Sequence, residues 1–138
     1  MNILKIIFVS MLALTMTACV STRHKIIEGG NQVKLRSMQT RAFDTTDKNN
    51  VVRNVIATLQ DLNFVIDKAD ADLGTVTATK LSGYQIKMTV SVRPKGKTQT
   101  SVRANAQYNL EPIQDPVVYQ QFFSALQKSL FLTAHSIE

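Results

Sequence analysis

Hydrophobic and polar residues alternate along two stretches in the second half of the chain. The hydrophobic positions are Tyr84, Ile86, Met88, Val90 and Val92 in the first stretch, and Val102, Ala104, Ala106, Tyr108 and Leu110 in the second. A period of two places every second side chain on the same face of a strand. The intervening Pro94-Lys95-Gly96-Lys97 is typical of a turn. We therefore predict a β-hairpin with one face in the core and the other facing water or a partner.

Three shorter segments also favour strands. They are residues 38–43, residues 64–66 and the β-branched run 75–80, with a polar turn over 67–74 and a turn signal at Ser82-Gly83. The spacing changes to three and four in two other segments, which predicts amphipathic helices.

The first predicted helix has its apolar face on Val51, Val52, Val55, Ile56, Leu59 and Leu62, while Arg53, Asn54, Thr58 and Gln60 are expected to face away. The cluster Asp44-Thr45-Thr46-Asp47 supplies helix-capping residues before it. Asn63 stands where a left-handed residue is expected to end the helix.

The second predicted helix starts at Asp115-Pro116, with aspartate as N-cap and proline at the first helical position. Its apolar face comprises Tyr119, Phe122, Phe123, Leu126 and Leu130, widened by Phe131 and Ala134. The predicted order is β-α-β-β-β-β-α. We expect an α+β domain with an antiparallel sheet of four to five strands and two helices on one face.

The segment from residue 20 to residue 37 is polar and has no sustained apolar period. Gly29-Gly30-Asn31 lies in its middle, and we interpret the segment as a flexible tether. Ile26-Ile27 and Val33 with Leu35 could instead add a short strand or dock on the domain.

The first residues have the layout of a secretory signal peptide. Lys5 precedes an apolar run over residues 6–14, and small residues precede Cys19. The run is shorter than the roughly 20 residues that a transmembrane helix needs. Met16-Thr17-Ala18-Cys19 resembles the lipobox of bacterial lipoproteins. That resemblance implies cleavage after residue 18 and acyl chains on Cys19. An ordinary thiol beside an ordinary cleavage site is the alternative.

The residues after Cys19 bear on the destination. Val20 and Ser21 lack the aspartate that retains such lipoproteins in the inner membrane of enteric bacteria, so the resemblance implies the periplasmic face of the outer membrane. The expected organisation is a signal peptide over 1–18, a lipidated cysteine and tether over 19–37, and one periplasmic domain over 38–138.

Composition limits the chemistry. Cys19 is the single cysteine, so none remains for a disulfide, a thiolate metal site or a nucleophile. Removal of 18 residues from 138 leaves 120, which suits one domain. Only Lys5 is charged within the signal peptide, so the net charge falls from +6 to +5. For an exported protein this favours anionic lipid, lipopolysaccharide, peptidoglycan or an acidic protein over nucleic acid. The alternative is that the basic surface only keeps the protein soluble.

Six cations and no anion lie between Leu73 and Leu110. They are Lys80, Lys87, Arg93, Lys95, Lys97 and Arg103. Strand parity and the hairpin turn gather all but Lys80 on one sheet face and one end, which predicts a docking surface for an anionic partner. The alternative is a solvated face whose charges discourage edge pairing.

Other polar clusters favour structural roles. Asp67, Asp70 and Asp72 with Gly74 do not follow the EF-hand spacing, so we interpret them as turn residues rather than calcium ligands. His24 and His135 have no further ligands at metal spacing. We find no catalytic motif, and we expect no enzyme activity, metal or cofactor.

Three stretches resemble a family of small proteobacterial lipoproteins of unassigned function. They are Gln39–Thr45, Leu59–Phe64 with Leu73-Gly74, and Val118–Phe123. Asn63 takes the place of the family's usual glycine. The expected architecture is loosely similar to the helix-grip domains of the BamC lipoprotein of the β-barrel assembly machinery.

The sequence therefore predicts a lipid-anchored periplasmic binding protein, expected to be an accessory subunit of an envelope assembly, transport or secretion machine. A stand-alone binder of peptidoglycan or lipopolysaccharide is the first alternative. A hydrolase with an unrecognised site is the second.

Overall fold

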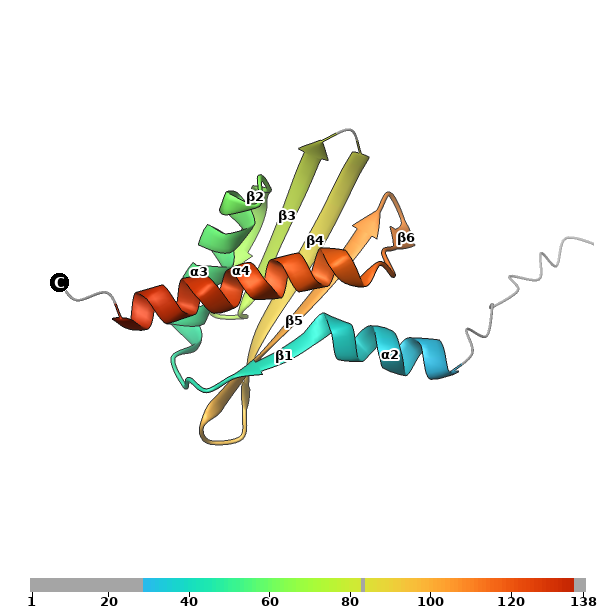
Figure 1. Ribbon diagram of the computed structural model, residues 1–138. Coiled ribbons are helices and arrows are strands. Elements are labelled where there is room, and N and C mark those ends of the chain that lie inside the picture. Colours follow the sequence, from blue (N-terminus) through green and yellow to red (C-terminus); the bar gives the residue numbers. More distant parts are fainter. Residues whose placement is uncertain (1–28, 83, 136–138) are drawn as a thin grey trace, which may run out of the picture.

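The protein folds as an α+β domain, which the computed structural model describes over residues 29–82 and 84–135. Its elements in chain order are α2 (Gly29–Gln39), β1 (Thr40–Phe43), α3 (Lys48–Asp61), β2 (Val65–Asp70), β3 (Thr75–Ser82), β4 (Tyr84–Lys95), β5 (Gln99–Tyr108), β6 (Glu111–Pro112) and α4 (Pro116–His135). The strands form one antiparallel sheet in the order β1-β5-β4-β3-β2, and β6 pairs with β5 (Figure 1).

The predicted hairpin is confirmed as β4 and β5, which pair from Ile86 opposite Tyr108 to Lys95 opposite Gln99. The hydrophobic positions Met88, Val90, Val92, Val102, Ala104 and Ala106 are all buried. The prediction fails at the end of β5, because Tyr108 is 41% exposed and Leu110, which follows the strand, is 90% exposed. Neither lies beneath a helix, so alternation alone did not predict burial there.

The helix predicted over 51–62 is confirmed as α3, and its ends are capped as expected. Asp47 accepts a hydrogen bond from the backbone N–H of Asn50 at 2.9 Å. Asn63 has a φ of 64°, as a left-handed residue after the helix should. Val51, Val55 and Leu59 are fully buried and pack with α4 and the inner face of the sheet in one core.

The outward assignment of Asn54 and Thr58 is wrong, since these residues are 5% and 1% exposed. Asn54 Oδ1 accepts hydrogen bonds from Ser129 Oγ at 2.7 Å and Thr133 Oγ1 at 2.9 Å on α4. Its Nδ2 donates to the backbone oxygen of Asn50 at 2.9 Å. Because α4 packs on this side of α3, a polar side chain there becomes buried and must find polar partners.

Thr58 provides a test of that packing, because its buried hydroxyl has no hydrogen-bond partner among the described residues. We expect Thr58→Val to raise the free energy of unfolding by about 1 kcal/mol, since valine has the same shape without the hydroxyl. Urea denaturation measures the change. Thr58→Ser is the control, because it keeps the hydroxyl and loses the methyl group, and should destabilise the protein. A valine variant no more stable than the wild type would contradict the prediction.

The second predicted helix is confirmed as α4, with Asp115 accepting from the N–H of Val117 at 2.9 Å. Tyr119, Phe122, Phe123 and Leu126 are buried. The predicted widening of this face is wrong, because Phe131 is 61% exposed and Ala134 is also exposed. The last turns of α4 extend past the sheet (Figure 1), so no strand covers them.

The predicted element order lacked two elements. Residues 29–39 form α2 in place of the expected tether, and β6 adds a two-residue strand, so the described residues contain six strands and three helices. Residues 20–28 lie outside the described residues. Leu35 is the residue of α2 that packs against the core, while Val33 is 69% exposed. A helix with only one hydrophobic residue against the core shows no apolar period, which is why the sequence did not predict α2.

Candidate functional site

The predicted docking residues of β4 and β5 lie on the sheet face opposite the core. Arg93 pairs with Ser101 and Arg103 with Ser91, so the two arginines are diagonal neighbours on that face. Lys95 continues the row at the hairpin end, and all three side chains are exposed. The sheet therefore brings three of the predicted cations together.

The other three cations of this region differ in their positions relative to this group. Lys87 is on the same face, but six residues before Arg93, a distance of roughly 20 Å along a strand. Lys97 is exposed in the hairpin turn, which projects beyond the other strands (Figure 1). Lys80 pairs with Ile86 on the core parity, and its Nζ lies 5.7 Å from the ring centroid of Phe64. The basic surface is thus concentrated at the hairpin end.

Apart from the charged Lys87 and the exposed, apolar Leu81, the rest of this face is polar and uncharged over β3, β4 and β5. Its side chains belong to Thr75, Thr77, Thr79, Thr89, Ser91, Ser101, Asn105 and Gln107, which are exposed or half-buried. Hydroxyl and amide groups on a flat sheet suit water and a polar partner equally. The basic end is the part of the face with a chemical preference.

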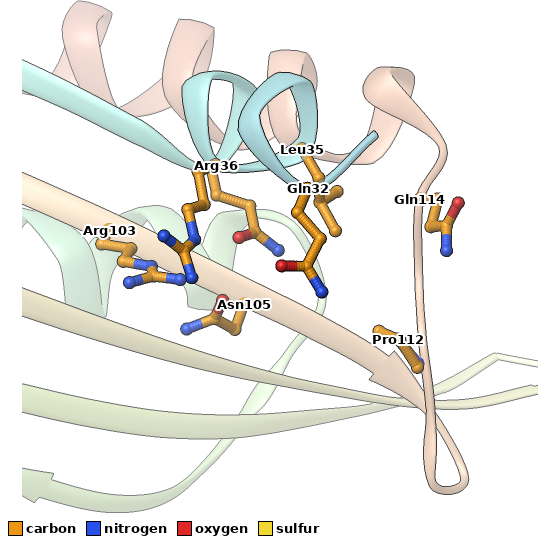
Figure 2. Close-up of a pocket in the computed structure, with 8 residues that line it drawn as sticks. Gln32, Leu35, Arg36, Arg103, Asn105, Pro112 and Gln114 are labelled. Atoms are coloured by element: carbon orange, nitrogen blue, oxygen red, sulfur yellow. The ribbon is translucent and has the colours of Figure 1, made fainter. Parts of the chain in front are cut away.

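A pocket that the sequence did not predict lies where α2 approaches β5. It has a volume of ≈ 280 Å³ and is lined by Gln32, Leu35, Arg36, Gln39, Arg103, Asn105, Pro112 and Gln114. Figure 2 shows Arg36 and Gln32 extending from α2 towards β5, where Arg103 and Asn105 lie. Arg103 was a predicted site residue, whereas Arg36 was assigned to the tether. The pocket therefore joins a predicted cation to one that only the helix brings near it.

The floor of the pocket lies at a gap in the sheet. Along one edge of β5, β1 pairs with residues 100–103 and β6 with residues 107–108, so no strand covers the residues between them. The hydroxyl of Tyr119 occupies this gap. It donates to the backbone oxygen of Ile113 at 2.7 Å and accepts from the N–H of Ala106 at 3.3 Å. A side chain from α4 thus completes the hydrogen bonding of the edge.

The same hydroxyl holds one wall of the pocket. Gln39 Nε2 donates to Tyr119 Oη at 3.2 Å, and both side chains are buried, at 5% and 1% exposure. Gln39 is therefore fixed in place before any ligand arrives. Neither residue was predicted to have this role, because the contact depends on α2 and α4 meeting at the sheet edge.

The residues of the pocket favour binding rather than acid–base chemistry. Two guanidinium groups donate hydrogen bonds and accept none, and amide side chains both donate and accept hydrogen bonds. Within the described part of the chain, no acidic residue lines the pocket. The arrangement can hold an anion and orient polar groups beside it.

The remaining predicted residues have structural positions. Asp70 Oδ1 accepts from the N–H of Leu73 at 2.8 Å, which confirms its predicted turn role, and Asp67 accepts from Thr79 Oγ1 at 2.6 Å. The turn between β2 and β3 is shorter than the predicted turn over residues 67–74, because β2 continues to Asp70. His135 stacks on Phe131 with ring centroids 4.2 Å apart. Cys19 and His24 lie outside the described residues.

Over residues 29–82 and 84–135, no group of three or more His, Cys, Asp or Glu residues is placed to hold a metal ion. In the same ranges no helix has the length and apolar character needed to cross a membrane. A comparison with models of known protein families and with curated proteins found no match for this chain.

Proposed function

We propose that this protein is a lipid-anchored lipoprotein of the outer membrane, held on the periplasmic face, whose α+β domain acts by binding. The proposed anchor is Cys19, supported by the signal-peptide pattern and by Met16-Thr17-Ala18-Cys19. Two or more acyl chains would make the attachment stable, whereas one chain binds reversibly. The domain would act as an accessory subunit of an envelope assembly, transport or secretion machine.

The observation that carries the binding role is the basic end of the open sheet face. Arg93, Lys95 and Arg103 project from two paired strands, so their spacing is set by the backbone ladder rather than by flexible loops. Lys97 adds a fourth cation at the projecting turn. Clustered cations of this kind attract an anionic surface and orient it on approach. We expect an acidic protein partner to dock here.

In-cell cross-linking of the tagged full-length protein, followed by mass spectrometry, tests this role. We expect the wild type to capture a small reproducible set of envelope proteins and Cys19→Ser to lose them, because the unanchored chain leaves the membrane. Arg93→Glu with Lys95→Glu should lose the same partners while remaining in the membrane fraction. Lys128→Glu is the matched control, since this exposed lysine lies on α4. Capture of abundant porins alone would overturn the subunit proposal.

The second candidate function is binding of peptidoglycan or lipopolysaccharide through the same basic end. The exposure of these cations favours it, since exposed charges bind polyanions without a shaped pocket. Such binding is screened by salt. We expect the protein to sediment with isolated sacculi or lipid at low salt and to be released at high salt, if this function holds. If the protein shows no affinity for sacculi, and a defined protein partner is released from it when the sample is diluted, the result favours the subunit function instead.

A further inference from the structure

The pocket between α2 and β5 brings two like charges together without a neutralising partner in its lining. Arg36 comes from α2 and Arg103 from β5, and both side chains are exposed. Figure 2 shows the Arg36 side chain extending from α2 towards β5, the strand that carries Arg103. Two cations that line one hollow concentrate positive potential more than they would on a flat surface. This potential favours a ligand with a compact negative charge.

Four amide side chains surround the rest of the pocket. Gln32, Gln39, Asn105 and Gln114 supply both hydrogen-bond donors and acceptors. A simple inorganic anion accepts hydrogen bonds and has no need of acceptors around it. Hydroxyl groups pair with both donors and acceptors, so the amides suit a ligand with several hydroxyl groups. Leu35 and Pro112 add small apolar surfaces that suit the C–H face of a ring.

Size and rigidity limit the ligand further. The volume of ≈ 280 Å³ lies near the lower end of the roughly 300–1,000 Å³ typical of small-molecule sites. Gln39 is held by the hydroxyl of Tyr119, so part of the wall is ordered in advance. A group the size of one sugar ring fits these limits better than an extended peptide.

We propose that this pocket binds an anionic sugar, meaning a monosaccharide-sized group that carries a phosphate or a carboxylate. Arg36 and Arg103 hold the anion through charge-assisted hydrogen bonds, which arginine can make in pairs. The four amides form hydrogen bonds with the hydroxyl groups of the sugar. This site shares Arg103 with the proposed protein-docking end, and it does not depend on the lipid anchor.

Titration of the full-length protein in detergent micelles with three matched sugars tests the proposal. Glucose 6-phosphate and glucuronate carry the two anion types on the same ring, and glucose is the neutral control. We expect at least one anionic sugar to bind about tenfold or more tightly than glucose, because only it engages the guanidinium groups. The tighter of the two identifies the anion. Inorganic phosphate alone should bind more weakly than glucose 6-phosphate.

Nitrogen-15 NMR locates the binding within the protein. The side-chain N–H signals of Arg36, Arg103 and Asn105 should shift on titration, while the Nε–H signal of Arg93, which is not part of the pocket lining, should stay in place. Equal binding of glucose, equal binding of phosphate alone, or the absence of shifts in the pocket would each overturn the proposal.

Arg36→Gln is the decisive variant, because this residue belongs to the pocket and not to the docking end. We expect it to weaken binding of the anionic sugar about tenfold with an unchanged thermal midpoint, since its side chain is exposed. Lys97→Gln removes the same charge at the hairpin turn and should leave binding unchanged. Gln114→Ala should also weaken binding. Unaltered affinity in Arg36→Gln would overturn the proposal, and its cross-linking pattern reports on the docking role separately.

Discussion

Replacement of Gly74 by alanine is expected to lower the free energy of unfolding by about 3–4 kcal/mol. Gly74 lies just before β3, has a φ of 64°, and a Cβ there would lie 2.3 Å from the carbonyl oxygen of Val92 on β4. The two backbones cannot separate cheaply, because the Val92 N–H donates to the Gly74 oxygen at 2.7 Å. Urea denaturation of the full-length protein in detergent measures the loss.

Gly96 provides a matched control for this substitution. It has nearly the same φ, 63°, in the turn between β4 and β5, but a Cβ there would meet nothing within 4 Å. Gly96→Ala should therefore lose only the cost of the left-handed conformation, about 1 kcal/mol. The difference between the two variants measures the close approach to Val92. Equal losses would contradict the predicted clash at Gly74.

Removal of the Tyr119 hydroxyl is expected to lower the free energy of unfolding by about 2–3 kcal/mol. Tyr119→Phe keeps the ring in the core and takes away hydrogen bonds to Ile113, Ala106 and Gln39. The Ala106 N–H then lies at the gap between β1 and β6 without its partner. A buried polar group that loses its hydrogen bond costs its full desolvation energy, which makes this loss larger than that of an exposed hydroxyl.

A double-mutant cycle with Gln39→Leu is the control for this prediction. The single Gln39 variant leaves Tyr119 bonded to Ile113 and Ala106, so we expect it to cost about 1 kcal/mol. The double variant should lose less than the sum, because both single variants remove the same contact. Strict additivity would mean that the Gln39 contact contributes nothing. An unchanged stability of Tyr119→Phe would contradict the role assigned to the hydroxyl at the sheet edge.

The strongest sequence patterns correspond to elements that bury one whole face. The alternation in β4 and the aromatic spacing in the first turns of α4 each follow from repeated contact with a single core. The caps of α3 and α4 were also predictable, because Asp47, Asn63 and Asp115 act on backbone groups within three residues of themselves. Local chemistry of this kind needs no knowledge of distant segments.

The errors fall where a distant segment decides the environment. Asn54 is buried because Ser129 and Thr133 lie opposite it, and both are more than seventy positions away in the chain. Phe131 is exposed because the last turns of α4 extend past the sheet (Figure 1). The periodicity of a helix reveals which face is apolar, but not how far its neighbour extends.

The residues of the candidate pocket also differ in whether the sequence could predict them. Arg103 was predicted as a site residue from strand parity, which depends only on the residues around it. Arg36 was not, because Leu35 is the hydrophobic residue of α2 that packs against the core, and one such residue leaves no apolar period. Its helix is positioned by contacts with β1, β5 and α4. A pocket between elements exists only when both are in place.

Local sequence patterns were sufficient to predict the α+β class, the core-facing sides of β4 and β5, the helix caps and the cations of the hairpin, because each depends on residues close together in the chain. It also carries the whole case for Cys19 as a lipid anchor. Only the folded chain shows that the Tyr119 hydroxyl lies in the gap between β1 and β6 and that Arg36 and Arg103 line one pocket. Both depend on segments that are far apart in sequence and adjacent only after folding, so no local pattern could encode them.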